Sequence, residues 1–181
     1  MIIRKLDTYS EYGKAIELRV RCWDEELAGY ASNRLDADKE LDFLIEWEQS
    51  AEENDDVRSI YGVFESGEFA GFAGASYAES SDSDHGFELN YLFVHEDYRG
   101  KAYSFHLMKK LLEEFIAHGK TEMIVYSHRH APSNNLYRKL GGKVIREVVQ
   151  GGEDHFQIDV FIFDAKKLNT RIQKALSAKK T

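Results

Sequence analysis

The sequence predicts a mixed α/β fold whose sheet is mostly antiparallel and twisted, with helices on its flanks. Two observations lead to this fold class. The spacing of apolar residues changes repeatedly between helical and strand-like periods. Hairpins lie early and late in the chain, with a strand–helix–strand crossover between them. In chain order we expect a strand over 1–6, helices over 8–29 and 36–54, strands over 59–65, 69–78 and 87–94, a helix over 102–118, a strand over 121–127, a helix over 132–140, and strands over 143–150 and 155–163.

Local signals place the elements of the first half. Thr8 and Glu11 form the pattern of a capping box, so a helix is expected to begin there. A cluster of acids from Asp36 to Glu40 suits the positive end of the second helix. The tight turn Ser66-Gly67-Glu68 predicts a hairpin between two strands. The polar run from Glu79 to Gly86 that follows is interpreted as a solvated connector.

The second half alternates apolar strands with amphipathic helices. Gly119 is a suitable C-terminal cap for the helix over 102–118. Pro132, the only proline, stands at the first turn of the next helix, where its missing N–H group is tolerated. A Gly151-Gly152 turn is expected to join the last two strands. We predict one domain over residues 1–165 and a basic tail over 166–181 that is helical or frayed.

The composition excludes several classes of protein. The net charge of −8 argues against a nucleic-acid binder, which needs a basic face, and is compatible with a cationic substrate. With one cysteine, Cys22, the chain forms no internal disulfide and no multi-cysteine zinc site; we expect a buried thiol. Scattered histidines argue against a metal. No segment has the length of a membrane span, and residues 1–5 lack a signal sequence, so we expect a cytoplasmic protein.

The segment from Val94 to Ser104 has the order of an anion-binding turn. A strand ends, a basic turn with Gly100 follows, and an amphipathic helix begins. The first amides of a helix have no intrahelical partner and favour an anion. Arg99 and Lys101 add positive charge. The alternative is an ordinary polar turn before a helix.

The run 88–94 followed by Tyr98-Arg99-Gly100-Lys101 resembles motif A of the GNAT superfamily of N-acetyltransferases. The resemblance implies a GNAT-like fold with a central splayed strand pair, and acetyl-CoA as co-substrate. It implies that the pantetheine arm pairs with the backbone of Leu92, Phe93 and Val94, and that the pyrophosphate binds the amides of Arg99, Gly100, Lys101, Ala102, Tyr103 and Ser104.

Two residues of this turn depart from the family pattern. Ala102 stands where the first motif glycine is expected, and Ser104 stands where the second small residue is expected. We expect both to have near-helical backbone geometry, in which a Cβ atom costs little strain.

The segment 132–142 resembles the helix of GNAT motif B, with departures at His130, Ser133 and Gly142. The resemblance implies that Tyr137 protonates the departing thiolate of coenzyme A; the alternative is a tyrosine ring that packs in the core. Asn134 is expected to contact the pantetheine arm or to cap the start of the helix.

An amine must lose a proton before it attacks a thioester, so the chain needs a general base. Glu88, on the strand that leads into the turn, is the candidate, and a surface glutamate is the equal alternative. His85, His128 and His130 are further candidates.

We therefore expect an acetyl-CoA-dependent N-acetyltransferase in which a primary amine of a small molecule or peptide attacks directly in a ternary complex. An amide near Val94 would hold the oxyanion, and Cys22 lies outside both motifs. The segments 8–54 and 79–86 would shape the acceptor pocket. Two alternatives are a catalytically impaired module that binds CoA or acyl-CoA, and an interaction domain without a small ligand. No membrane partner is expected, and a homodimer is left open.

Overall fold

The computed structural model describes residues 1–150 and 155–178. Contacts divide the chain into two compact units. Unit 1 comprises residues 1–76 and 91–111, and unit 2 comprises residues 77–90 and 112–181. Strand β4 and helix α3 each begin in one unit and end in the other.

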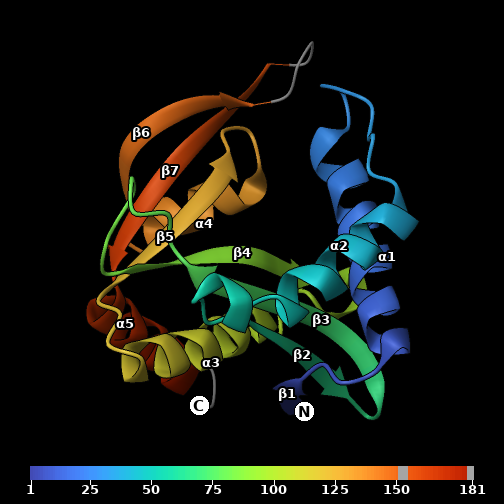
Figure 1. The fold of residues 1–181 in the computed structure, drawn as a ribbon, viewed down its shortest axis with the longest axis horizontal. Helices are drawn as coiled ribbons and strands as arrows, with labels where there is room; N and C mark the ends of the chain where they lie inside the picture. The colour runs from blue at the N-terminus through green and yellow to red at the C-terminus, as the bar shows by residue number, and fades with distance from the viewer. Residues whose placement is uncertain (151–154, 179–181) are drawn as a thin grey trace. The chain divides into compact units, whose positions relative to one another are not determined.

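The strands form a seven-stranded sheet in the order β1-β2-β3-β4-β5-β7-β6. The pair β4–β5 is parallel, whereas β1–β2, β2–β3, β5–β7 and β6–β7 are antiparallel. This confirms the predicted mixed α/β fold with a mostly antiparallel sheet. The elements, labelled in Figure 1, are β1 (Ile2–Lys5), α1 (Tyr9–Leu27), α2 (Ala37–Gln49), η1 (Glu52–Asn54), β2 (Ser59–Glu65), β3 (Glu68–Tyr77), β4 (Gly86–Val94), η2 (Glu96–Tyr98), α3 (Tyr103–Ala117), β5 (Glu122–His128), α4 (Pro132–Lys139), β6 (Lys143–Gln150), β7 (Phe156–Asp164) and α5 (Ala165–Ala178).

Unit 1 is organised around a core between the helices α1 and α2 and the strands β2, β3 and β4. The predicted cap of α1 is confirmed, because the Thr8 side chain accepts a hydrogen bond from the amide of Glu11. Asp36 caps α2 in the same way. Cys22 is buried, as predicted. The core contains Leu6, Ala15, Ile16, Leu18, Cys22, Leu41, Leu44, Ile60, Phe64, Phe72 and Tyr91.

The predicted extent of the second helix is wrong at its C-terminal end. Helix α2 ends at Gln49, and the chain tightens into the short 3-10 helix η1. Asp55 then has a left-handed backbone conformation, with a φ angle of 50°. Such a residue ends a helix, and neither glycine nor proline marks this point in the sequence.

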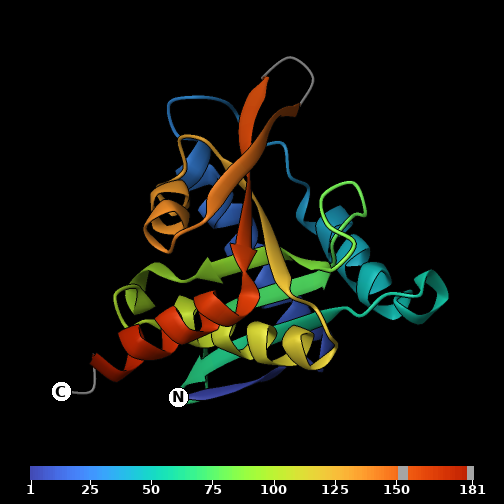
Figure 2. The ribbon, with the colours of Figure 1, turned by 90° about the vertical axis from the view of Figure 1, so that its left-hand side faces the viewer.

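In unit 2, β7 lies between β5 and β6. The strands β6 and β7 and the helix α5 that continues from them can be followed in Figure 2. Helix α5 buries Ala165, Leu168, Ile172 and Leu176. The predicted Gly151-Gly152 turn lies outside the described residues.

The parallel ladder of β4 and β5 is short. It joins Gly86–Glu88 to Glu122–Ile124, although within unit 2 β4 continues to Asn90 and β5 continues to His128. The two strands thus diverge after three residue pairs, as expected for a splayed pair. Within residues 1–150 and 155–178, no helix is both long and apolar enough to cross a membrane.

Candidate active site

The glycine turn, residues 99–104, connects the end of β4 to α3 within unit 1. Gly100 and Ala102 both have left-handed backbone conformations, with φ angles of 81° and 65°. The prediction that Ala102 is near helical geometry is therefore wrong. A left-handed φ brings Cβ close to the following carbonyl oxygen, at a cost of roughly 1–2 kcal/mol for an L-residue. Glycine avoids this cost, which explains its place in the family pattern.

The start of α3 leaves amides available to a ligand. The first hydrogen bonds of the helix run from the amides of Phe105 and His106 to the carbonyl oxygen of Ala102, at 3.0 and 3.1 Å. The amides of Tyr103 and Ser104 precede this ladder, at the positive end of the helix dipole.

The space beside Gly100 also suits close approach of a ligand. A Cβ atom built on Gly100 meets no described heavy atom within 4 Å. Turns of this kind present amides to anions. The glycine turn thus has open space beside Gly100 and helix-start amides that face no intrahelical partner.

The two cations of the turn are not free at its rim, because each is paired with a carboxylate of unit 1. Arg99 Nη2 lies 2.6 Å from Glu25 Oε2 of α1, and Arg99 Nε donates to the carbonyl oxygen of Val94 at 3.3 Å. Lys101 Nζ lies 2.7 Å from Glu65 Oε2 at the end of β2. Sequence reasoning missed both carboxylates, since nothing in the chain's local pattern links residues so far apart.

The end of β4 is held firmly against β3. The amide of His95 donates to the carbonyl oxygen of Ala70 at 2.9 Å. A Cβ atom on Gly71 would lie 2.5 Å from the carbonyl oxygen of Phe93, so Gly71 permits this close approach. The predicted pantetheine-binding residues 92–94 are only partly buried, which leaves part of their surface accessible.

Glu88 lies in unit 2, in a partly buried cluster rather than on the open surface. Burial and the negative charges of Asp82 and Glu79 together raise the pKa of its carboxyl group to about 7, against a hydrogen bond from Asn90 that lowers it. Ile124 pairs with Glu88, so Tyr126, two residues on, lies on the same face of the sheet.

The loop over 79–86 is exposed along most of its length, as a solvated connector should be, but Asp82 departs from this interpretation. The Asp82 side chain is 1% exposed. It accepts hydrogen bonds from the hydroxyl of Tyr126 and from Arg146 Nε, the latter at 2.8 Å. Tyr126 of β5 and Arg146 of β6 both pair with Val160 of β7, so they lie in one row across the sheet. The sequence did not predict this role of Asp82, because a run of small polar residues is typical of exposed loops.

Asn134 has a structural role in α4. Its Nδ2 donates to Asp159 Oδ2 at 3.0 Å, and its Oδ1 accepts from Arg138 Nε at 3.0 Å. Among the residues that the structure describes, no side chain caps the start of α4, so the predicted capping role is wrong. Pro132 at the first turn removes one of the amides that such a cap would serve.

Asp159 of β7, with a side chain 1% exposed, organises this region. Arg129 Nη2 lies 2.9 Å from Oδ1, and Arg138 Nη2 lies 2.7 Å from Oδ2. Burial alone would raise the pKa of Asp159, but hydrogen bonds from Arg129 and Asn134 outweigh it and lower the pKa. The sequence offered no signal for this buried charge, which interrupts an apolar strand.

Tyr137 is buried, with 5% of its surface exposed. Its ring packs against Phe161 and Phe163, with centroid distances of 5.8 and 6.3 Å. A Cβ atom on Gly142 would come within 2.5 Å of the Phe163 ring. The departure from the family pattern at Gly142 therefore makes room for an aromatic ring supplied by β7.

The three histidines named as further bases differ in their surroundings. His85 and His130 are exposed, whereas His128 is buried. Burial lowers the pKa of His128, and the nearby His130 lowers it further. Within the described parts of the chain, no group of three or more His, Cys, Asp or Glu side chains is placed to hold a metal ion.

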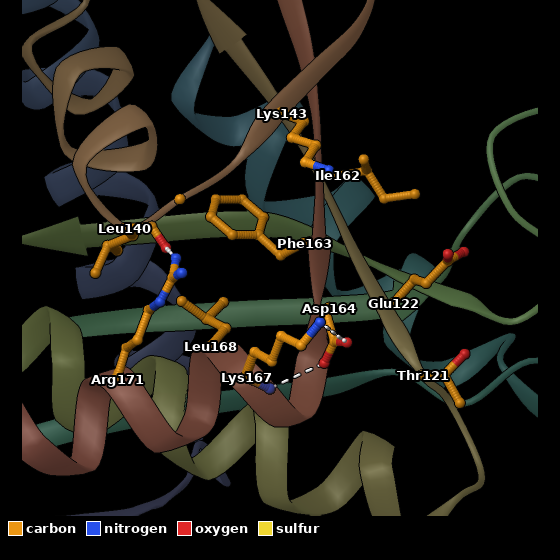
Figure 3. Close-up of a pocket in the computed structure, with 11 residues that line it drawn as sticks. Thr121, Glu122, Leu140, Lys143, Ile162, Phe163, Asp164, Lys167, Leu168 and Arg171 are labelled. Carbon is orange, nitrogen blue, oxygen red and sulfur yellow. Dashed lines mark hydrogen bonds and ion pairs between the residues drawn. The ribbon is translucent and has the colours of Figure 1, made fainter.

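A pocket of about 460 Å³ lies in unit 2 beside α5 (Figure 3). Arg171 crosses its edge and donates to the carbonyl oxygen of Leu140 at 2.7 Å, and Lys167 pairs with Asp164. The lining contains no predicted site residue: Thr121, Glu122, Leu140, Gly141, Lys143, Ile162, Phe163, Asp164, Lys167, Leu168 and Arg171.

Comparison with known proteins gives the chain's family. No curated protein sequence matches it. Several solved structures share its fold. That of yncA from Salmonella typhimurium, with its cofactor acetyl-CoA, has a TM-score of 0.68 at 21% identity and covers 91% of this chain and 94% of its own. A ribosomal-protein-alanine N-acetyltransferase from Brucella melitensis has a TM-score of 0.68 at 17% identity, covering 91% and 99%.

The PaiA N-acetyltransferase from Thermoplasma acidophilum, in complex with coenzyme A, has a TM-score of 0.63 at 20% identity, covering 90% of this chain and 98% of its own. The model of the acetyltransferase (GNAT) family matches residues 16–142, well over half of the sequence. The chain therefore belongs to the GNAT family of acetyltransferases.

Proposed function

We propose that this acetyltransferase transfers the acetyl group of acetyl-CoA to a primary amine of a small molecule or peptide, by direct attack in a ternary complex. The observation that carries this proposal is Glu88, whose carboxyl group has a pKa of about 7 and faces further acids. A carboxyl group with this pKa is partly ionised at neutral pH and can accept a proton from an ammonium group.

The glycine turn would hold the pyrophosphate of acetyl-CoA through the amides from Arg99 to Ser104. Its left-handed residues and the open space at Gly100 support this role. The backbone of residues 92–94 would pair with the pantetheine arm. Bound acetyl-CoA supplies an acetyl group activated as a thioester.

In this proposal the protein's own residues move two protons. The Glu88 carboxylate accepts a proton from the amine, directly or through a water, so that the nitrogen can form the new C–N bond. As the C–S bond breaks, the Tyr137 hydroxyl donates a proton to the leaving sulfur. The cluster around Glu88 also favours a cationic acceptor, because Arg146 is already paired with Asp82 and leaves the charge of Glu88 uncompensated.

A second candidate is a regulatory module that binds CoA or acyl-CoA without turnover. The departures from the family pattern at Ala102, Ser104 and Gly142 favour it.

Thiol release from acetyl-CoA across a panel of mono-, di- and polyamines and amino-terminal peptides separates the candidates. We expect turnover with at least one amine, at rates that rise with pH through about 7. Calorimetric binding of CoA without turnover across the panel would support the module. Absence of binding to acetyl-CoA, CoA and longer acyl-CoAs would contradict both candidates.

A further inference from the structure

The cations of the glycine turn are engaged by carboxylates that come from two separate elements of unit 1. Glu25, near the C-terminal end of α1, contacts Arg99 at 2.6 Å, and Glu65, at the end of β2, contacts Lys101 at 2.7 Å. The two cations lie on either side of Gly100 in the sequence. The turn that offers its amides to an anion thus has its side-chain charges already neutralised.

Stability alone is a weak reason for these two pairs. The side chains of Arg99 and Glu25 are 48% and 39% exposed, and those of Lys101 and Glu65 are 47% and 33% exposed. Ion pairs at such positions contribute about 0–1 kcal/mol to folding. Partners this exposed can separate at low cost, so each cation can exchange its carboxylate for another anion.

We propose that Glu25 and Glu65 are internal counter-ions that occupy Arg99 and Lys101 in the unliganded protein and are exchanged for the oxygens of a bound diphosphate. This inference rests on the proposed function, in which the turn holds the pyrophosphate of acetyl-CoA. The two carboxylates then lower the affinity for CoA and reduce its dependence on salt, because the unliganded turn carries no net side-chain charge.

The two counter-ions differ in how firmly they are held. Glu65 also accepts a hydrogen bond from the buried Tyr103, and the hydrogen bonds from Lys101 and Tyr103 lower the pKa of its carboxyl group. Glu25 has no comparable anchor among the contacts described for it. The Cys22 sulfur also contacts Arg99 and lies 3.7 Å from Arg99 Nη2. Exchange at Arg99 is therefore the easier of the two.

With its cations paired in this way, the glycine turn should bind best a ligand that contacts both the amides and the cations. A free monophosphate gains little, because the turn has no net charge to attract it. A diphosphate within a larger ligand gains the amides first and the cations on exchange. The counter-ions thereby favour a diphosphate over a free monophosphate.

Calorimetric titration of the full chain with CoA at 50 and 300 mM NaCl tests this inference. We expect Glu25→Gln to lower the Kd up to about fivefold at 50 mM, the equivalent of one exposed ion pair. Because Glu65 is the more firmly held competitor, Glu65→Gln is expected to have a larger effect of the same sign, and both effects should shrink at 300 mM. Asp24→Asn is the matched control, since it removes the same charge from the adjacent exposed position of α1.

A double-mutant cycle makes the result specific to the ion pair. The gain from Glu25→Gln is expected to vanish in an Arg99→Gln background. If both glutamine variants bind CoA as the unmodified protein does, or more weakly, the carboxylates are not counter-ions, although the proposed function stands. If the unmodified protein does not bind CoA at all, the proposed function fails and this inference fails with it.

Discussion

The glycine turn of unit 1 and the Glu88 cluster of unit 2 treat charge in opposite ways. In the turn, Arg99 and Lys101 each have a carboxylate partner within 2.7 Å. In the cluster, Arg146 pairs with Asp82, and Glu88 stays beside acids with its pKa raised to about 7. The first region is neutral until an anion replaces a carboxylate. In the second, the negative charge of Glu88 is unfavourable, and protonation or a nearby ammonium group stabilises this region.

The largest expected effect tests the second region. Glu88→Gln removes the proposed base and should lower kcat about 10²- to 10⁴-fold. The pH–rate profile of the unmodified protein should rise through about 7, and this rise should be absent in the variant. Asp84→Asn, in the exposed part of the preceding loop, is the control for a simple change of charge. An unchanged profile in Glu88→Gln would assign the base elsewhere.

Tyr137→Phe tests the proposed acid. The ring contacts with Phe161 and Phe163 survive this change, so the protein should still fold. We expect kcat to fall by up to about 100-fold, at the lower end of proton-transfer effects, because a thiolate is a moderate leaving group. Equal turnover in both proteins would leave Tyr137 as a packing residue.

The raised pKa of Glu88 also has a consequence for stability. Its folded value of about 7 lies above the ordinary value of 4.5, so the folded protein holds a proton that the unfolded chain has lost. Stability is then greatest below pH 4.5 with respect to this group and falls as the pH rises to about 7.

Urea unfolding at two pH values measures this linkage. At pH 8, Glu88→Gln should be more stable than the unmodified protein by up to about 3 kcal/mol, and at pH 4 the two should match. A difference that does not change with pH would show that the carboxyl group has an ordinary pKa.

Asp159→Asn should destabilise unit 2 without a direct effect on charge at Glu88. Arg129 and Arg138 lose a buried partner, and we expect a cost of about 1–3 kcal/mol in the free energy of unfolding. The exposed Asp164→Asn provides the comparison, with little expected change. Equal stability of the two variants would mean that Asp159 does not organise α4.

The smallest effect is expected in the glycine turn. Ala102→Gly relieves the left-handed strain, although the greater freedom of glycine in the unfolded chain offsets part of the gain, so stability should rise by about 0–1 kcal/mol. Ala102→Val should lower it, because a branched side chain tolerates this backbone poorly. Destabilisation by glycine would contradict the strain inferred for Ala102.

The two regions also differ in how far the sequence predicts them. The order of elements follows from local periodicity and caps, as at Thr8 and Pro132, because these signals act within a few residues. The left-handed φ of Ala102 could not be predicted from the sequence, because it depends on how the turn joins β4 to α3. The pairs Arg99–Glu25 and Asp82–Arg146 join residues far apart in the chain, and no local pattern announces them.

Titration of the Glu88 carboxyl carbon by NMR tests the central claim most directly, since it needs no knowledge of the acceptor amine. Glu88→Gln assigns the resonance. We expect a midpoint near pH 7 for Glu88. A midpoint near the ordinary value of 4.5 would show that the cluster does not raise the pKa of Glu88. The assignment of Glu88 as the base would then lose its support.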